Sequence, residues 1–408
     1  MRAVVLGATG NIGTAVTEHL AGDPNVTSVI GVARRTPTRP TSSFPGAQKV
    51  AWMSADIRSD SLETVLDGAD TVVHLAWMFQ PTHRPEITWQ TNVIGTSRLL
   101  EAVRNTGVTT LAIASSIAAY SPRTGTTPVD ETWPTHGASS AAYAREKAYV
   151  ERLLDAFESR SASRVVRVRP AFVFQRRSAS EQRRIFAGPL VPGWLVRPSL
   201  VPALPAPAGL RLQAVHASDV ADAFARAVRS EQDGAFNVCA DDVLEPRDLA
   251  RLFDAPHVRV RAGLLRGVMN AAWTARALPA DPRLFDAVMM LPIMSNGRAR
   301  EVRAWLAPEQ VGTPCVGRVL GRTATRCRPP HPAAQARRPV GRHNRKIGGP
   351  LGRKPQQSSG DAGRLVCCAG RLAFGGPALS EVDAENGHGT DREELRLPVL
   401  KGTAPEVR

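Results

Sequence analysis

Near its N-terminus the chain reads Ala3-Val-Val-Leu-Gly-Ala-Thr-Gly-Asn-Ile-Gly-Thr-Ala-Val16. The apolar run at its start predicts a short buried strand, and the apolar spacing after the glycines predicts a helix. Between them lies a turn with Gly7, Gly10 and Gly13. Such glycines let the backbone approach a pyrophosphate, and the helix N-terminus offers free N–H groups and a positive dipole end. An ordinary strand-to-helix turn is the alternative; we favour a dinucleotide-binding corner.

The composition is that of a globular protein. The chain has 408 residues, of which 43% are hydrophobic, enough for one large α/β domain with additions or for two domains. Every apolar stretch is too short or too interrupted by charges and prolines to suggest a membrane span, which needs about 18 residues. The N-terminus enters a core strand at once, so we expect no secretory signal. Cysteines are sparse and form no disulfide framework, which favours a cytoplasmic location.

The net charge of +15 is unevenly distributed. Residues 312–408 hold 17 Lys and Arg against 8 Asp and Glu, whereas residues 1–311 hold 35 against 29. Much of the basic character therefore belongs to the C-terminal stretch. The body of the chain is not predicted to bind nucleic acid.

A second buried strand is predicted over residues 26–32, and it ends in Ala33-Arg34-Arg35. An acidic residue after this strand would bind the adenosine ribose of NAD, whereas an arginine can pair with the 2′-phosphate of NADP. A solvated basic turn is the alternative. The sequence favours NADP, with Arg34 as a candidate ligand, and leaves NAD open.

Further strands are predicted near residues 48–52, 70–76, 111–114 and 164–169, with a helix over 86–105. Strands that alternate with helices predict a doubly wound parallel sheet, the Rossmann type of α/β fold, with its ligand at the carboxyl ends of the strands. Asp56 follows the third strand and could accept a hydrogen bond from adenine. It could equally cap the next helix, for which Ser59 and Asp60 compete. His74 lies within the fourth strand and is interpreted as a core residue.

Ser116 closes the fifth strand, and Tyr143 and Lys147 follow at a spacing that puts both on one helix face. A neighbouring ammonium and a bound nicotinamide would favour the phenolate and lower the pKa of the tyrosine. Such a tyrosine can exchange a proton with a substrate oxygen that the serine holds. Tyr-x-x-x-Lys alone is common, but together with the glycine turn and the serine it predicts hydride-transfer chemistry.

The chain resembles an extended short-chain dehydrogenase/reductase of the NAD-dependent epimerase/dehydratase family, which includes UDP-glucose 4-epimerase-like proteins. The resemblance runs from Met1 to about Trp305. The motifs that carry it, in order, are Gly-x-x-Gly-x-x-Gly at 7–13, Asp56-Ile57, His74-Leu75-Ala76, Asn92-Val93-Ile94-Gly95-Thr96, Ser115-Ser116 with Tyr120, Tyr143 with Lys147, Arg169-Pro170-Ala171-Phe172-Val173 and Val215-His216-Ala217-Ser218-Asp219-Val220-Ala221.

The resemblance implies roles for individual residues. Ser116, Tyr143 and Lys147 would be catalytic, with Asn92 supporting the lysine region. The implied cofactor-binding residues are Gly7, Gly10, Asn11, Ile12, Gly13, Arg34, Asp56, Ile57, Leu75, Ala76, Lys147 and Pro170. We interpret Asp219 as structural, either a helix cap or a partner of Arg169.

Two positions depart from the family pattern and put the loop geometry in doubt. Ser121 follows Tyr120 where the family often has glycine, and Gln175 stands where a glycine usually closes the arginine-proline motif. Ile117 and Ala118 follow Ser116, which argues against a dehydratase because that branch usually adds an acid/base pair there.

The chain is predicted to comprise an NAD(P)-binding Rossmann core over 1–175 and a substrate lobe over 176–311, from which 213–240 returns to the core. The lobe begins with Arg176, Arg177, Arg183 and Arg184, which could meet a nucleotide-sugar diphosphate or form a solvated loop. The apolar residues up to 209 hint at a less polar substrate or a protein contact. Apolar helices over 259–294 are expected to cover the lobe as core.

Residues 312–408 form a basic tail rich in Pro, Gly and Arg, which is predicted to be disordered. Residues 312–360 contain eleven Lys and Arg and no Asp or Glu. A nucleic-acid-binding arm is one interpretation. We favour a change of reading frame in the gene, because the resemblance stops in the middle of an element. The spacing of Cys315, Cys327, His331 and His343 fits no zinc pattern, so no metal site is predicted.

The expected function is that of an NAD(P)-dependent oxidoreductase or isomerase that acts at a secondary alcohol or ketone. Epimerase and reductase activities stay open, and a nucleotide sugar is one substrate class. The expected partner is a small-molecule substrate, and no membrane association is expected. A homodimer is a further possibility for the assembly of the chain. A non-catalytic NAD(P)-sensing regulator on the same fold is the alternative function; such proteins typically lack the tyrosine or the lysine.

Overall fold

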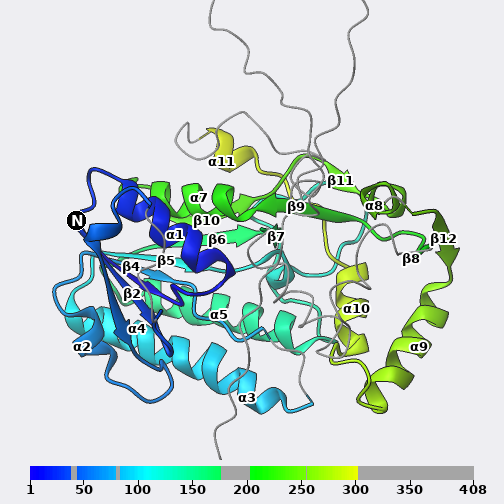
Figure 1. The fold of residues 1–408 in the computed structure, drawn as a ribbon, viewed down its shortest axis with the longest axis horizontal. Helices are drawn as coiled ribbons and strands as arrows, with labels where there is room; N and C mark the ends of the chain where they lie inside the picture. Colours follow the sequence, from blue (N-terminus) through cyan, green and yellow to red (C-terminus); the bar gives the residue numbers. More distant parts are fainter. Residues whose placement is uncertain (38–43, 80–82, 176–202, 254, 302–408) are drawn as a thin grey trace, which may run out of the picture. The chain divides into compact units, whose positions relative to one another are not determined.

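The structure is a computed structural model that describes residues 1–37, 44–79, 83–175, 203–253 and 255–301. Its central element is a seven-stranded sheet (Figure 1). In the order in which they lie across the sheet, the strands are β10 (Gly234–Val238), β6 (Arg164–Pro170), β5 (Thr110–Ala114), β4 (Thr71–His74), β1 (Arg2–Leu6), β2 (Ser28–Ala33) and β3 (Val50–Ser54). All neighbouring strands are parallel, so the predicted doubly wound sheet is confirmed.

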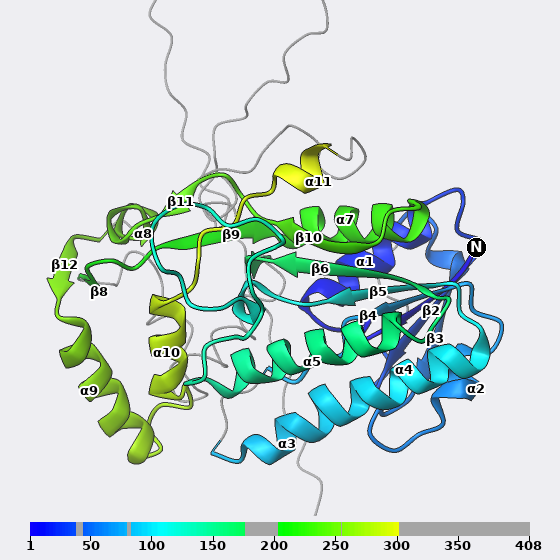
Figure 2. The same ribbon diagram turned by 180° about the vertical axis from the view of Figure 1, so that it is seen from behind.

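Helices cover both faces of this sheet (Figures 1 and 2). One face carries α1 (Asn11–Gly22) and α7 (Ala217–Arg229), and the other carries α2 (Leu62–Leu66), α4 (Gly95–Thr106) and α5 (Ala142–Glu158). In α7 the residues Val220, Phe224 and Val228 recur every four positions and are buried, as an apolar helix stripe requires. Two apolar layers therefore enclose the sheet, and its strand ends remain available for a site.

The order of the strands reverses between β1 and β4. From β1 the chain builds β2 and β3 on one side, then crosses to build β4, β5 and β6 on the other. The two crossovers leave opposite sides of the sheet at this point, which opens a crevice outside the carboxyl ends of the strands. The predicted cofactor residues cluster at this position.

The helix predicted over 86–105 is present, but a wider turn interrupts it. It comprises α3 (Pro85–Trp89), a π-helical turn η2 (Gln90–Ile94) and α4. The π-helical turn contains Asn92, which is fully buried. Such turns are rare and often lie at functional sites.

The remaining elements lie beyond β6. A three-stranded sheet contains β7 (Phe172–Phe174), β9 (Leu212–His216) and β11 (Val243–Leu244), and β8 (Leu204–Pro207) pairs with β12 (His257–Val260). The helices are α8 (Pro246–Phe253), α9 (Ala262–Thr274), α10 (Pro282–Met289) and α11 (Gly297–Glu301), and short turns are η1 (Ala47–Lys49) and η3 (Ile117–Ala119).

One expectation about this region changes. In α9, Leu264 and Val268 are 66% and 60% exposed, so the prediction that residues 259–294 are core is wrong for this face of α9. Within residues 213–240, β10 pairs in parallel with β6 of the central sheet. The arginine cluster at 176–184 and the tail from 312 onward lie outside the described residues. The domain boundaries stay a prediction.

Candidate active site

The glycine corner has the geometry that its three glycines were expected to provide. Gly7 has a φ of +82°, and a Cβ there would lie 2.7 Å from the backbone nitrogen of Ala76. A Cβ on Gly13 would collide with the carbonyl oxygen of Gly7. Gly10 caps α1 without a side chain and is exposed. Gly7 thus makes the turn, Gly13 allows α1 to pack on β1, and Gly10 leaves the backbone N–H groups of the helix start accessible.

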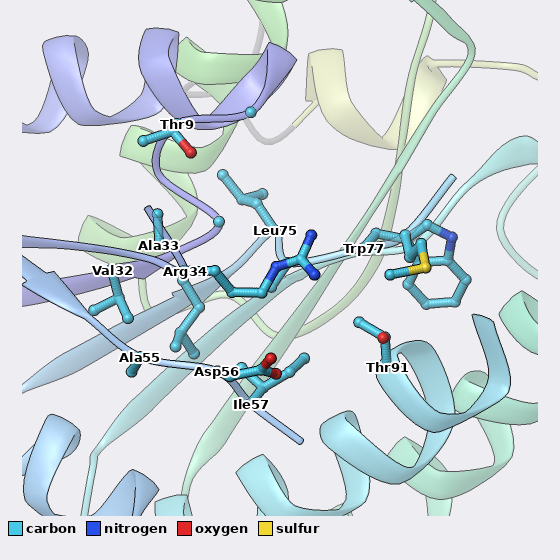
Figure 3. A pocket seen from close by; sticks show the side chains of 15 residues that line it. Thr9, Val32, Ala33, Arg34, Ala55, Asp56, Ile57, Leu75, Trp77 and Thr91 are labelled. Atoms are coloured by element: carbon cyan, nitrogen blue, oxygen red, sulfur yellow. The ribbon is translucent and has the colours of Figure 1, made fainter. Parts of the chain in front are cut away.

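A cavity opens at the carboxyl ends of β1, β2, β3 and β4 (Figure 3). The residues that line it are Leu6, Gly7, Thr9, Gly10, Val32, Ala33, Arg34, Ala55, Asp56, Ile57, Leu75, Ala76, Trp77, Met78 and Thr91. Of the predicted cofactor residues, Gly7, Gly10, Arg34, Asp56, Ile57, Leu75 and Ala76 belong to this lining. Asn11, Ile12 and Gly13 lie in the first turn of α1, and Pro170 ends β6. The cavity runs from the glycine corner along the strand ends, which fits an extended dinucleotide.

Arg34 and Asp56 lie on the β2 and β3 side of this cavity. The Arg34 side chain is exposed and points into the cavity, whereas Arg35 does not belong to the lining (Figure 3). Asp56 accepts hydrogen bonds from Arg58, with the Nη2 atom 2.7 Å from Oδ2, and this contact lowers the pKa of Asp56. Ser61 caps α2, so the expectation that Asp56, Ser59 or Asp60 caps this helix is wrong. Asp56 therefore does not cap a helix, and its ionised carboxylate remains a hydrogen-bond acceptor at the edge of the cavity.

Ser116 and Tyr143 meet where β5 ends and α5 begins. Ser116 caps the short turn η3, and its Oγ accepts a hydrogen bond from the backbone nitrogen of Ala118 at 3.1 Å. Tyr143 lies in the first turn of α5. Burial raises the pKa of Tyr143, while a hydrogen bond with the Ser116 side chain partly offsets this rise. The side chains predicted to hold and to protonate a substrate oxygen are therefore in contact.

Lys147 lies one turn further along α5 and is buried. Its Nζ donates a hydrogen bond to the carbonyl oxygen of Ala114 at 2.7 Å and lies 3.3 Å from the centroid of the Trp77 ring. Burial lowers the pKa of Lys147 to about 7. Its Nζ lies 6.0 Å from the centroid of the Tyr143 ring, and the pKa of Tyr143 is raised by burial. The expectation that the lysine lowers the pKa of the tyrosine is therefore wrong for this structure.

Two aromatic residues that the sequence analysis missed surround these groups. The Phe79 ring meets the Tyr143 ring edge-on with centroids 4.6 Å apart, and the Trp77 ring does so at 6.0 Å. Trp77 follows directly after Ala76 at the end of β4, in line with the residues expected at the cofactor. Its place next to this motif was the signal that could have identified it.

Asn92 was expected to support the region of Lys147, and its side chain contacts residues next to the site. Its side-chain oxygen accepts a hydrogen bond from the Met78 backbone nitrogen at 2.7 Å, and its Nδ2 donates to the Met78 carbonyl oxygen at 3.0 Å. The same Nδ2 donates to Glu146, the residue before Lys147, at 2.7 Å. Asn92 therefore links the segment after β4 to α5. Glu146 had no signal in the sequence, because a glutamate within a helix is commonly a solvated side chain.

His74 is confirmed as a core residue. Thr96 donates to the carbonyl oxygen of Asn92 at 2.6 Å, so its single proton is used. The 3.0 Å contact between His74 Nε2 and the Thr96 hydroxyl then requires that His74 donates. Burial lowers the pKa of His74 to about 3, so the ring is neutral.

A buried ion-pair network contacts Ser115, the residue before Ser116. Glu151 is fully buried and accepts hydrogen bonds from Ser115, Arg167 and Arg169. Arg169 also donates to the Tyr120 hydroxyl at 3.0 Å. The described partners of Arg169 are Glu151, Tyr120 and the carbonyl oxygen of Glu131. The interpretation of Asp219 as a partner of Arg169 or as the helix cap is therefore wrong, because His216 caps α7.

Gln175, which stands where the family usually has glycine, contacts the glycine corner. Its side-chain nitrogen donates to the carbonyl oxygen of Asn11 at 2.6 Å. Asn11 in turn donates from Nδ2 to the carbonyl oxygen of Val173 at 3.4 Å. The side chain that replaces glycine therefore ties the segment after β6 to the start of α1.

Comparison with known families identifies the class of protein. A family model described as NAD dependent epimerase/dehydratase family matches residues 3–239, more than half of the chain. The chain belongs to this family.

The individual relatives are distant. An uncharacterized protein from Mycobacterium tuberculosis is 27% identical over 275 residues, which are 67% of this chain and 25% of the relative. The matched part thus spans about a quarter of the length of the curated relatives. Among solved structures, a UDP-N-acetylglucosamine 4-epimerase from Methanobrevibacter ruminantium superposes with a TM-score of 0.59 at 16% identity, over 78% of this chain and 96% of that one.

Two further structures contain NAD. A dTDP-glucose 4,6-dehydratase from Streptomyces venezuelae, solved with NAD, has a TM-score of 0.59 at 20% identity, over 78% of this chain and 96% of that one. A UDP-glucose 4-epimerase from Thermus thermophilus, solved with NAD, has a TM-score of 0.57 at 22% identity, over 78% and 99%. At these identities the structures establish the shared fold.

Within the described ranges, no group of three or more His, Cys, Asp and Glu side chains is arranged to hold a metal ion. The described helices include none with the length and apolar character needed to cross a membrane.

Proposed function

We propose that the chain is an NAD(P)-dependent enzyme that transfers a hydride at a secondary alcohol or ketone, with Tyr143 as the acid/base. The contact between Tyr143 and Ser116 beside the cavity at the strand ends carries this proposal. A regulator that only senses the cofactor has no need for a tyrosine, a serine and a lysine at this place.

The residues divide the chemistry between them. When bound, NAD(P) supplies or accepts the hydride. Ser116 donates a hydrogen bond to the substrate oxygen, and Tyr143 gives that oxygen a proton as a carbonyl is reduced, or takes one as an alcohol is oxidised. The raised pKa of Tyr143 keeps it a phenol near neutral pH, which suits the proton-donating direction. Lys147 would hold the hydroxyls of the nicotinamide ribose when the cofactor is bound.

NADP is the cofactor that we propose on the basis of Arg34. Its exposed guanidinium points into the cavity beside the end of β2, where the adenosine ribose of a bound dinucleotide lies in this fold (Figure 3). Guanidinium groups match phosphate oxygens in geometry and charge. Asp56 lies opposite as an acceptor for the adenine amino group.

For the substrate we propose a nucleotide sugar, the class named for the solved relatives. The test is to titrate the purified chain with NADP and with NAD by calorimetry. The chain is then incubated with UDP-glucose or UDP-N-acetylglucosamine and the tighter-binding cofactor. We expect NADP to bind more tightly and a sugar to be epimerised or oxidised. If neither dinucleotide binds, the proposed function is wrong; if one binds and no sugar reacts, the substrate class is wrong.

A further inference from the structure

Helix α5 buries two glutamates whose surroundings differ. Glu151 is 0% exposed and meets the guanidinium groups of Arg167 and Arg169. These partners lower its pKa to about 2, so it is ionised. Glu146 is 3% exposed, and its hydrogen-bond partners are a hydroxyl and an amide, both neutral. A buried carboxylate without a cationic hydrogen-bond partner is costly.

The hydrogen bonds of Thr88 bear on the protonation of Glu146. The Thr88 hydroxyl lies 2.8 Å from the carbonyl oxygen of Pro85 and 2.5 Å from Oε1 of Glu146. A hydroxyl has one proton, and a carbonyl oxygen can only accept. If Thr88 donates to Pro85, the shorter contact needs a proton on Oε1 of Glu146. The other carboxyl oxygen accepts from Asn92, so a protonated Glu146 satisfies every partner.

Burial outweighs the nearby cations at Glu146. Lys147 and Arg145 on α5 favour its ionised form, but burial is the larger effect and raises its pKa. From α3, Glu86 lines the same surface cavity as Glu146, with Pro85, Trp89, Ala142 and Arg145. Glu86 is exposed and its pKa is lowered by Arg84, so it brings a negative charge to this side.

Asn92 transmits the position of Glu146 to the active site. Both protons of its amide group are used, one on Glu146 and one on the Met78 carbonyl, while its oxygen receives the Met78 N–H. Met78 lies between Trp77 and Phe79 in the sequence. The Trp77 ring covers the Lys147 ammonium, and the Phe79 ring packs on the Tyr143 ring. Fixing the backbone at Met78 therefore fixes the aromatic walls around both proposed catalytic side chains.

We infer that Glu146 carries a proton in the folded chain and is a positioning residue for the active site. As a neutral acid it donates to Thr88 and accepts from Asn92. Asn92 then holds Met78 and the two aromatic side chains beside it. The inference deepens the proposed function, because the roles of Tyr143 and Lys147 rest on that proposal, but the protonation of Glu146 can be measured without it.

Infrared spectroscopy of the full chain tests the protonation directly. The variant Glu146→Gln has an amide whose N–H₂ can donate to Thr88 and whose oxygen can accept from Asn92, so it matches the protonated acid in shape and hydrogen bonding. We expect the wild-type minus Glu146→Gln spectrum at pH 7 to contain the carbonyl band of a protonated carboxyl group. Glu86→Gln is the control and should remove carboxylate bands only. A Glu146→Gln difference with carboxylate bands alone would overturn the inference.

Rescue by the conservative variant tests the positioning. Glu146→Leu loses the link to Asn92, and we expect kcat/KM to fall by about 100-fold, as for a small misplacement of reacting groups. Glu146→Gln should stay within about threefold of the wild type, since it preserves the neutral hydrogen bonds. If Glu146→Leu folds and keeps full activity, or if Glu146→Gln loses as much as Glu146→Leu, the positioning role is wrong. If Glu146→Leu fails to fold, Asn92→Leu replaces it, because it breaks the same link from the other side, and full activity in that variant would overturn the positioning role.

Discussion

The ammonium of Lys147 lies 3.3 Å from the centroid of the Trp77 ring. Trp77 lies in the segment after β4, and Lys147 lies in α5. An ammonium at this distance over an indole is attracted by the negative face of the ring, an effect worth about 2 kcal/mol when both are shielded from water. Burial alone makes the charged lysine unfavourable. Trp77 therefore opposes the loss of the Lys147 proton.

Replacing the tryptophan should move the titration of Lys147. In Trp77→Leu the attraction is lost, so the pKa of Lys147 should fall further, by about one unit for about 1.4 kcal/mol. If the protonated lysine is the active form, the alkaline limb of kcat/KM against pH moves to lower pH by that amount. Trp77→Phe keeps an aromatic face and should move it less. An unchanged limb in Trp77→Leu would mean that the ring does not interact with the charge.

Arg34 should select the cofactor. In Arg34→Ala we expect the Kd of NADP to rise by about 10- to 100-fold, because a charge-assisted contact with the 2′-phosphate is lost. The Kd of NAD should change by less than about threefold. Arg35→Ala is the matched control, since Arg35 has the same charge but does not line the cavity. Equal effects of the two variants on NADP would contradict this role.

Lys147 should make stability depend on pH. Its pKa is about 7 in the folded chain and 10.5 in the reference state, so the unfolded chain binds more protons between these values. Stability then rises as pH increases through this window. In Lys147→Met this contribution is absent. The free energy of unfolding of the variant should exceed that of the wild type most at pH 6, and the difference should shrink toward pH 10; denaturant unfolding without cofactor measures it. A difference that grows with pH would contradict the lowered pKa.

The network at Glu151 should be essential for the fold. Glu151→Ala leaves the buried Arg169 without its carboxylate partner, whereas Arg167 keeps Asp155 and Glu158. We expect a loss of about 3–5 kcal/mol in the free energy of unfolding. Asp155→Ala on the same helix is the control. Asp155 also pairs with Arg167, but its side chain is 49% exposed, so its loss should cost about 0–1 kcal/mol. Similar losses for the two variants, measured by urea unfolding, would argue against a special role of the buried pair.

The sequence predicted the parts of this protein that depend on local patterns. Apolar runs located the strands of the central sheet, and the spacing of Gly7, Gly10 and Gly13 located the turn. Residues that follow directly after strands, such as Arg34 and Leu75, could be placed at the cavity because parallel strands end at one edge. The same rule would have identified Trp77.

Other features depend on contacts between distant segments and had no local signal. Glu146 looks like an ordinary helix residue until α3 and η2 surround it with Thr88 and Asn92. Glu151, likewise, becomes the partner of Arg169 only when β6 lies against α5. The helix cap at Ser61 was missed because Ser59, Asp60 and Ser61 are all competent caps, and the path of the chain after β3 decides between them.

The central claim, that Tyr143 exchanges the proton with the substrate, is tested most directly by Tyr143→Phe. The measurement is the rate of conversion of a confirmed substrate with saturating cofactor, together with the Kd of that cofactor in the same variant. We predict that the rate falls by about 10²- to 10⁴-fold, because the phenol proton is lost, while the cofactor Kd stays within about threefold. A variant that binds the cofactor normally and turns over at the wild-type rate would contradict the account.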